Sequence, residues 1–146
     1  MGTFYSLYDD LVRAGLKGEF ADDKGNVAGI EDFDPFHLEC LLRPEKQPPV
    51  LRLGPCKCDG GECEKTCMFE AAFRDKDGNV VIDKDKCTGC GECIENCKEG
   101  NLTDRKDIIP VLRALCDAKP PVYAIIAPAF ISQFSPDVTP GKLRAA

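Results

Sequence analysis

Residues 56–67 read CKCDGGECEKTC, and residues 87–97 read CTGCGECIENC. These two stretches contain eight of the ten cysteines in the chain of 146 residues. The first quartet has the spacing Cys-x-Cys-x4-Cys-x3-Cys, whereas the second has Cys-x2-Cys-x2-Cys-x3-Cys. Cysteines grouped in this way predict two metal-binding loops, and the rest of the chain is organised around them.

The second quartet follows the bacterial ferredoxin run, except that Lys98 replaces the proline after the last cysteine. In that run three cysteines on one loop hold a [4Fe–4S] cluster, and the fourth, at the start of a helix, ligates another cluster. We therefore expect the two quartets to exchange their last cysteines. The first ligand set is then Cys56, Cys58, Cys63 and Cys97, and the second ligand set is Cys67, Cys87, Cys90 and Cys93.

This part of the chain resembles the two-cluster bacterial ferredoxins, most closely at residues 86–93. The resemblance implies an α+β, ferredoxin-like domain with two [4Fe–4S] clusters. Gly89 and Gly91 are expected to adopt positive φ angles and to bring backbone N–H groups toward the cluster sulfurs, as cofactor-binding residues. The spacing of the first quartet departs from the family pattern, so its loop is expected to have a different shape.

A zinc site and a disulfide framework are the two alternatives to iron–sulfur clusters. Zinc usually sits between two separated Cys-x2-Cys knuckles, and these two tight quartets match that pattern poorly. Structural disulfides need an oxidising compartment, and the sequence opens without a secretory signal peptide. The cysteine pattern therefore favours clusters in a reducing, anaerobic cytoplasm.

The charge of the chain bears on its partners. Its net charge is −6, and residues 56–99 contribute −4 from eleven acidic and seven basic side chains. Eight thiolates and two oxidised cluster cores would bring the formal charge of the whole chain to −10. Such a field predicts low reduction potentials and a redox partner with a basic docking face. It argues against nucleic acid as a partner, and no apolar run is long enough to span a membrane.

The other elements are predicted from periodicity and caps. Helices are expected at 3–20, at 35–42 with Asp34 as cap, and from residue 107 with Pro110 in the first turn. A strand is expected at 50–53, a helical turn at 68–72, and a hairpin at 72–74 and 80–82 with its turn at 77–78. His37, Cys40 and Cys116 are interpreted as packing residues rather than as ligands.

The last stretch of the chain carries a second resemblance. Residues 122–131 read VYAIIAPAFI, and residues 138–143 read VTPGKL. These segments look like the opening of the catalytic domain of the [FeFe]-hydrogenases, in which an Ala-Pro-Ala segment follows a two-cluster ferredoxin-like domain. The apolar run at 122–127 predicts a buried strand that would lack sheet neighbours in this chain. We therefore expect a truncated C-terminal segment of a longer protein.

The hydrogenase resemblance implies that the two clusters exchange electrons with a six-iron active-site cluster, bound only by a longer parent chain. The three cysteine-containing segments that bind this cluster in the family are absent here, so no catalytic residue is predicted. The expected partners are a ferredoxin-type electron carrier and the missing catalytic domain. A free-standing two-cluster ferredoxin and a redox- or hydrogen-sensing regulatory protein remain alternatives.

The expected organisation has three parts. Residues 1–49 form an N-terminal helical extension, residues 50–119 form the dicluster domain, and residues 120–146 begin an incomplete catalytic domain.

Overall fold

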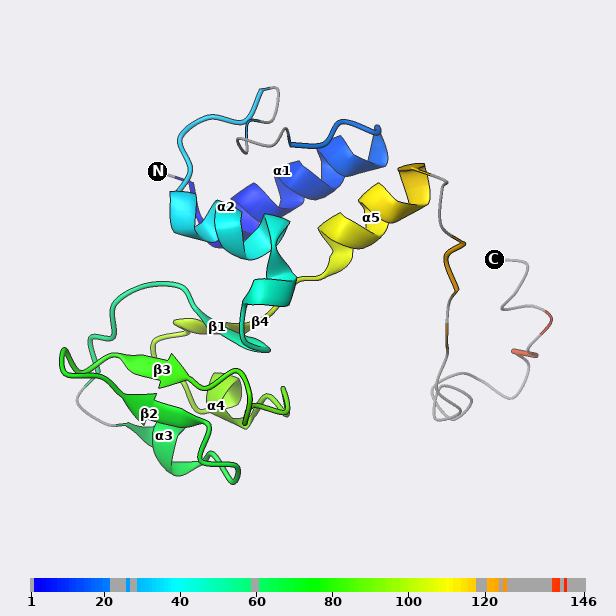
Figure 1. Cartoon of the computed structure of the whole chain (residues 1–146). Coiled ribbons are helices and arrows are strands. Elements are labelled where there is room, and N and C mark those ends of the chain that lie inside the picture. The colour runs from blue at the N-terminus through cyan, green and yellow to red at the C-terminus, as the bar shows by residue number, and fades with distance from the viewer. Residues whose placement is uncertain are drawn as a thin grey trace.

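The computed structural model describes residues 2–21, 26, 29–58, 61–117, 121–123, 125, 138, 139 and 141. Its elements are α1 (Phe4–Leu16), α2 (Pro35–Leu42), the 3-10 helix η1 (Pro44–Lys46), β1 (Val50–Arg52), α3 (Glu62–Lys65), β2 (Ala72–Arg74), β3 (Val80–Ile82), α4 (Glu92–Glu95), β4 (Leu102–Asp104) and α5 (Ile108–Asp117). The three longer helices gather on one side, and the strands with α3 and α4 lie on the other (Figure 1). The predicted α+β class is confirmed.

The three longer helices, α1, α2 and α5, form a unit that we call the helical unit. Asp34 caps α2 by accepting a hydrogen bond from the Phe36 N–H at 2.8 Å, and Pro35 takes the first helical position, as predicted. The buried side chains of this unit include Phe4, Leu7, Leu11, Leu38, Leu41 and Ile109. The helix α5, which falls within the range 50–119, thus packs with the N-terminal helices; the three-part division stays a proposal.

The cysteine-bearing part consists of two similar halves, which together we call the cysteine module. One half is β1, α3 and β2, and the other is β3, α4 and β4. The strands pair antiparallel between the halves, β1 with β4 and β2 with β3. Each half therefore contributes one strand to each two-stranded sheet, which brings the two cysteine loops close together.

The predicted hairpin is confirmed, and a strand was missed. In the β2–β3 hairpin, Phe73 lies opposite Val81, and Gly78 has the positive φ of 79° that its turn requires. The strand β4 was not predicted because its sequence, Leu-Thr-Asp, contains a single apolar residue and shows no alternation. It is a strand because β1 pairs with it, with Leu51 opposite Thr103.

Strand β1 lies between two separate cores. Leu51 belongs to the core of the helical unit, whereas Val50 is buried among the cysteines. Two hydrogen bonds also cross this boundary: the Tyr5 hydroxyl lies 2.9 Å from Thr103 Oγ1, and His37 Nε2 donates to the Leu53 carbonyl at 2.8 Å. Because His37 and Cys40 are both buried, their prediction as packing residues agrees with the structure.

The prediction of a helical turn at 68–72, after Cys67, was wrong. The helical turn α3 precedes Cys67, and the chain turns back at once afterwards, with the Glu70 N–H donating to the Cys67 carbonyl at 3.1 Å. Glu70 adopts a φ of 52°, a left-handed conformation that a helix cannot continue. Gly100, with a φ of 60°, makes the same turn after Cys97. Both fourth cysteines therefore follow short helices instead of starting them.

Cys116 was also predicted wrongly, because its side chain is exposed. The helix α5 packs on α1 through Leu112, whose side chain lies 3.2 Å from the position that a Cβ on Gly15 would take. Since α1 ends at Leu16, the last turn of α5 extends beyond the surface that would bury Cys116.

The buried strand expected at 122–127 is not seen at Val122, Tyr123 and Ile125, which are exposed and in no strand. The other residues of that run, and the whole Ala-Pro-Ala segment at 127–129, lie outside the described residues. Among the described helices, none combines the length and the apolar character needed to cross a membrane.

Candidate metal centre

Each cysteine loop enters its short helix through a glycine in the left-handed conformation. Gly61 precedes α3 with a φ of 66°, and Gly91 precedes α4 with a φ of 90°. These turns place the third cysteine of each quartet, Cys63 or Cys93, inside the helix, where both are buried. The fourth cysteine follows the helix end and can therefore face away from its own loop.

The fourth cysteines have matching surroundings. The Ala71 N–H donates to Cys67 Sγ at 3.3 Å, and the Asn101 N–H donates to Cys97 Sγ at 3.3 Å. In both halves the donor lies four residues after the cysteine. This repeated N–H···S contact is of the kind that holds a cysteine thiolate and tunes a bound cluster.

One cavity joins the last cysteine of the first quartet to the second quartet. It is lined by Cys67, Cys87, Cys90 and Cys93, which are the four members of the second ligand set, together with apolar side chains that include Val50, Phe69 and Ile82. The structure therefore brings these four thiols around a common space, as an exchange of last cysteines requires. The assignment of the ligands remains a proposal.

The thiolates that act on the two buried cysteines, Cys63 and Cys93, belong to the same two ligand sets. Burial and then the nearby thiolates of Cys87, Cys67 and Cys90 raise the pKa of Cys93 to about 11. Burial and then the thiolate of Cys97 raise the pKa of Cys63, with a smaller contribution from Cys58. Each buried thiol therefore has the fourth cysteine of the other quartet as a neighbour.

Cys67 differs, because its backbone surroundings favour the thiolate. Although burial alone raises it, the N–H groups of residues 69–72, of which Ala71 contributes most, lower the pKa of Cys67 below its usual value. A thiolate stabilised in this way is ready to bind a metal ion.

The chemistry of these residues fits [4Fe–4S] clusters. All eight cysteines of the quartets are free thiols, and soft thiolates are the ligands that such clusters use. Iron would stabilise the thiolate forms that burial and mutual repulsion disfavour at Cys63 and Cys93.

Three residues near the sulfurs were missed from the sequence: Arg74, Asn79 and Asn101. The Asn79 side chain accepts from the Cys56 N–H at 2.9 Å, and Asn101 Nδ2 donates to the Gly54 carbonyl at 2.7 Å. A signal for both asparagines was present, since residues 76–80 and 98–102 share the pattern Lys-acid-Gly-Asn-apolar. No comparable pattern marks Arg74.

The two candidate cofactor-binding glycines both have positive φ angles, 72° at Gly89 and 90° at Gly91. A Cβ on Gly91 would contact nothing within 4 Å, whereas a Cβ on Gly89 would lie 3.3 Å from Pro49 Cβ. Gly91→Ala thus introduces backbone strain alone, and Gly89→Ala adds a steric contact.

We therefore expect Gly91→Ala to speed the loss of visible cluster absorbance in air about 5- to 30-fold, the effect of roughly 1–2 kcal/mol of strain. Gly89→Ala should be faster still. Gly18→Ala is the control, because Gly18 has a φ of 79° and open space around it but lies at the end of α1. Equal rates for the Gly18 and Gly91 variants would show that the cluster loop does not depend on this conformation.

Free thiols grouped in this way, with N–H donors to several of their sulfurs, fit an iron–sulfur site. In agreement, the family model described as "4Fe-4S binding domain" matches residues 79–102. The chain therefore contains a 4Fe–4S ferredoxin-type domain, and its homologues include iron–sulfur electron-transfer subunits of reductases.

Three relatives illustrate this similarity. A subunit of the selenate reductase of Mesobacillus selenatarsenatis is 44% identical over 50 residues, which are 34% of this chain and 17% of the relative. The thiosulfate reductase electron transfer subunit of Salmonella typhi is 38% identical over 47 residues, 32% of this chain and 24% of the relative. The Hdr-like menaquinol oxidoreductase iron-sulfur subunit 1 of Archaeoglobus fulgidus is 33% identical over 88 residues, 54% of this chain and 32% of the relative. The chain thus spans less than a third of each of these proteins. No solved structure matches the chain.

Proposed function

We propose that the chain passes single electrons through two [4Fe–4S] clusters, one bound by each ligand set, to the active site of a larger oxidoreductase. The main support for the proposal is that Cys67, the last cysteine of the first quartet, lines one cavity with Cys87, Cys90 and Cys93 of the second quartet. A bound cluster supplies one-electron chemistry that needs no proton transfer. The similarity to electron-transfer subunits supports the same role.

The residues of the chain hold the clusters and set their surroundings. Backbone N–H groups of Ala71, Val80 and Asn101 donate to cysteine sulfurs in both ligand sets. Cys90 is exposed, so the second ligand set reaches the surface, where a partner protein could approach it. We propose a ferredoxin-type carrier or another redox protein with basic groups as this partner.

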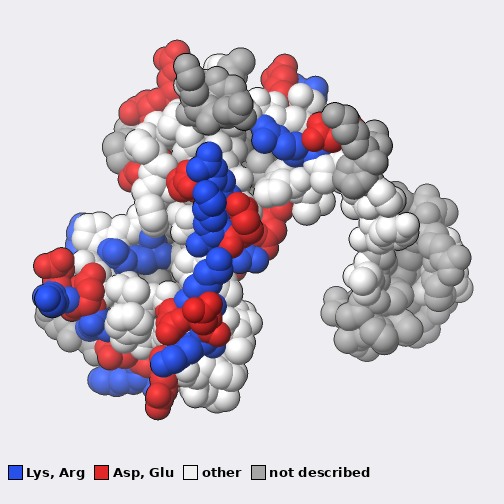
Figure 2. Space-filling model, in the orientation of Figure 1, with Lys and Arg blue, Asp and Glu red and all other residues white. Residues whose placement is uncertain are grey.

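The charged groups of the cysteine module are mixed. Figure 2 shows acidic side chains interspersed with lysines and arginines on the face it presents. The excess of eleven acidic over seven basic side chains in residues 56–99, together with the cluster charge, supports the basic partner. It does so through the overall field rather than through a single acidic patch on that face.

The proposal is tested by stoichiometry. Eight thiolates in two sets imply about eight irons and eight inorganic sulfides per chain after anaerobic reconstitution. Iron and sulfide assays on the purified full chain measure both numbers. Four irons per chain, or one zinc ion per quartet, would contradict the proposal.

The larger oxidoreductase that we propose is an [FeFe]-hydrogenase. The support is the resemblance of residues 122–131 and 138–143, which follow the 4Fe–4S domain in the order of that family. A catalytic domain in a longer parent chain would then bind the six-iron active-site cluster. The parent reading frame tests this: the three cysteine-containing segments of the family should follow residue 146. A reading frame without these segments would contradict the hydrogenase proposal and would leave the electron-transfer proposal unaffected.

A free-standing ferredoxin and a regulatory sensor are two alternatives that have less support than the hydrogenase proposal. A free-standing ferredoxin would bury its apolar tail, but Val122, Tyr123 and Ile125 are 48%, 82% and 96% exposed. A sensor that signals through cluster loss would share the same ligand sets, and no contact of the described residues favours it over electron transfer. A cytoplasmic location stays part of the proposal.

A further inference from the structure

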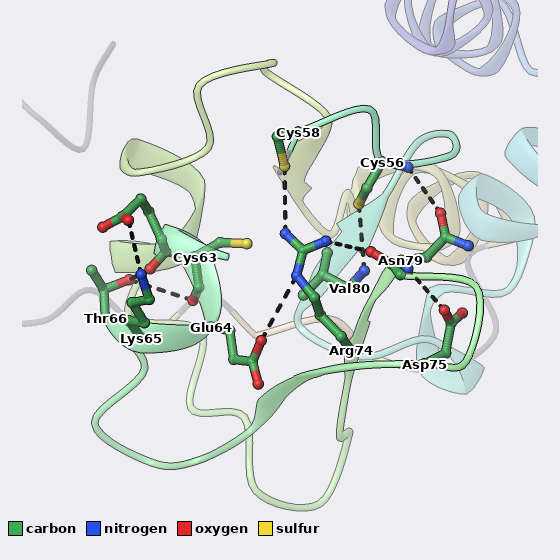
Figure 3. A network of polar contacts seen from close by, with 12 residues as sticks. Cys56, Cys58, Cys63, Glu64, Lys65, Thr66, Arg74, Asp75, Asn79 and Val80 are labelled. Atoms are coloured by element: carbon green, nitrogen blue, oxygen red, sulfur yellow. Dashed lines mark hydrogen bonds and ion pairs between the residues drawn. The ribbon is translucent and has the colours of Figure 1, made fainter. Parts of the chain in front are cut away.

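The guanidinium of Arg74 lies against the first ligand set. Its Nη2 donates to Cys58 Sγ at 3.5 Å, its Nη1 donates to the Gly78 carbonyl, and its Nε lies 3.8 Å from Glu64 Oε2 (Figure 3). The side chain therefore presents a permanent positive charge to a cysteine sulfur.

The fold holds Arg74 in this position from several sides. The turn carbonyl of Gly78 accepts a hydrogen bond from the guanidinium, and Gly61 leaves room for it. A Cβ on Gly61 would lie 3.3 Å from Arg74 Nε. In the β2–β3 ladder, Arg74 also lies opposite Val80, whose N–H donates to Cys56 Sγ at 3.4 Å. One residue pair thus delivers a cation and an N–H donor to two sulfurs of the same set.

The second ligand set lacks an equivalent cation among the described residues. There, Cys67 Sγ accepts from the Ala71 N–H, and the cavity is lined mostly by apolar side chains. No lysine or arginine of the described ranges donates a hydrogen bond to the sulfurs of the second set. The surroundings of the two sets therefore differ in charge even though their backbones are alike.

We propose that Arg74 makes the cluster of the first ligand set the more easily reduced of the two. The inference rests on the proposed two-cluster function. Reduction adds one negative charge, which a neighbouring cation and N–H donors stabilise, and hydrogen bonds to sulfur raise cluster potentials. An external one-electron donor is oxidised and the cluster is reduced, with no bond broken and no proton moved. The first electron then rests on the first set, and the second set, which includes the exposed Cys90, has the lower potential.

The test is an EPR-monitored redox titration of the reconstituted full chain, made after the iron assay. Two midpoint potentials are expected. In Arg74→Gln the higher midpoint potential should fall and the lower midpoint potential should stay unchanged. The expected fall is about 59 mV, which changes the equilibrium for transfer of one electron between the two clusters approximately tenfold. In a Cys87→Ala background, which should keep only the first cluster, the remaining potential should match the higher one and respond to Arg74→Gln.

Two further variants separate charge from structure. Lys65→Gln removes a cation from the same short helix as Cys63, but Lys65 pairs with Glu62 at 3.2 Å and is exposed, so only a small shift is expected. Glu64→Gln removes the carboxylate beside Arg74 and should raise the higher potential. Opposite signs for the Arg74 and Glu64 variants are the signature of a charge effect, because a structural role predicts loss of the cluster in both.

Several outcomes would overturn the inference. The first is a single midpoint potential for both clusters in a chain with eight irons. The second is a higher midpoint potential that Arg74→Gln leaves unchanged. The third is a shift in Lys65→Gln as large as the shift in Arg74→Gln. If the Arg74→Gln variant does not take up clusters, the Glu64→Gln variant tests the proposal instead. A fall of the higher midpoint potential in Glu64→Gln contradicts the proposal. Four irons in the unaltered chain would instead contradict the two-cluster function itself.

Discussion

Replacing Cys67 with alanine should remove the cluster of the second ligand set and leave the cluster of the first. The reason is geometric: Cys67 lines the cavity of Cys87, Cys90 and Cys93, whereas the neighbours of Cys63 are Cys97 and Cys58. The iron content should fall from about eight to about four per chain. By the same reasoning, Cys97→Ala should remove the first cluster, and EPR of the reduced variants should show different signals lost.

Double variants make the test independent of any spectral assignment. If the last cysteines are exchanged, Cys67→Ala combined with Cys87→Ala damages one cluster only, and about four irons remain. Cys63→Ala combined with Cys67→Ala damages both, and almost no iron remains. The opposite result, with iron retained in the Cys63 and Cys67 pair, would show that each quartet binds its own cluster. Cys116→Ala, an exposed cysteine of α5, is the control and should keep the full iron content.

The cysteine spacing predicted that Cys67 lies near Cys87, Cys90 and Cys93, because short loops leave the fourth cysteine of a quartet few positions to occupy. The hairpin at 72–74 and 80–82 and the capped helix at 35–42 also follow from local turn and cap chemistry. What could not be predicted depends on contacts between distant segments. The strand β4 exists only through its pairing with β1, and the position of Arg74 beside Cys58 depends on the β2–β3 ladder and on the space left by Gly61.

The errors have the same origin. Cys116 lies at helical spacing from Leu112 and Ile108, and periodicity alone places the three on one buried face. Its burial depends on the length of the neighbouring helix, and α1 ends at Leu16, too early to cover it. Similarly, Glu70 gives no sign in the sequence of the left-handed φ that prevents a helix after Cys67.

Removing iron should unfold the cysteine module and leave α1 and α2 of the helical unit protected. The core of the module consists largely of ligands: Cys63 and Cys93 are buried in it, and four more cysteines pack against it. Its strands have three residues each and form two-stranded sheets, which are marginal on their own. By comparison with structural zinc, metal binding contributes on the order of 10 kcal/mol, as much as the whole stability of a small domain.

Hydrogen exchange with mass spectrometry, made before and after reductive chelation of iron, measures this directly. Amides of β2 and β3 should exchange at nearly the unfolded rate in the iron-free chain, whereas those of α1 and α2 should stay protected by their own core. Leu41→Ala is the matched control: Leu41 is fully buried in the helical unit, so the variant should lose about 2–5 kcal/mol there while the iron-loaded module stays protected. Simultaneous loss of protection in α1 and in the hairpin after chelation would show that β1, which contributes Leu51 to one core and Val50 to the other, couples the two cores into one cooperative unit.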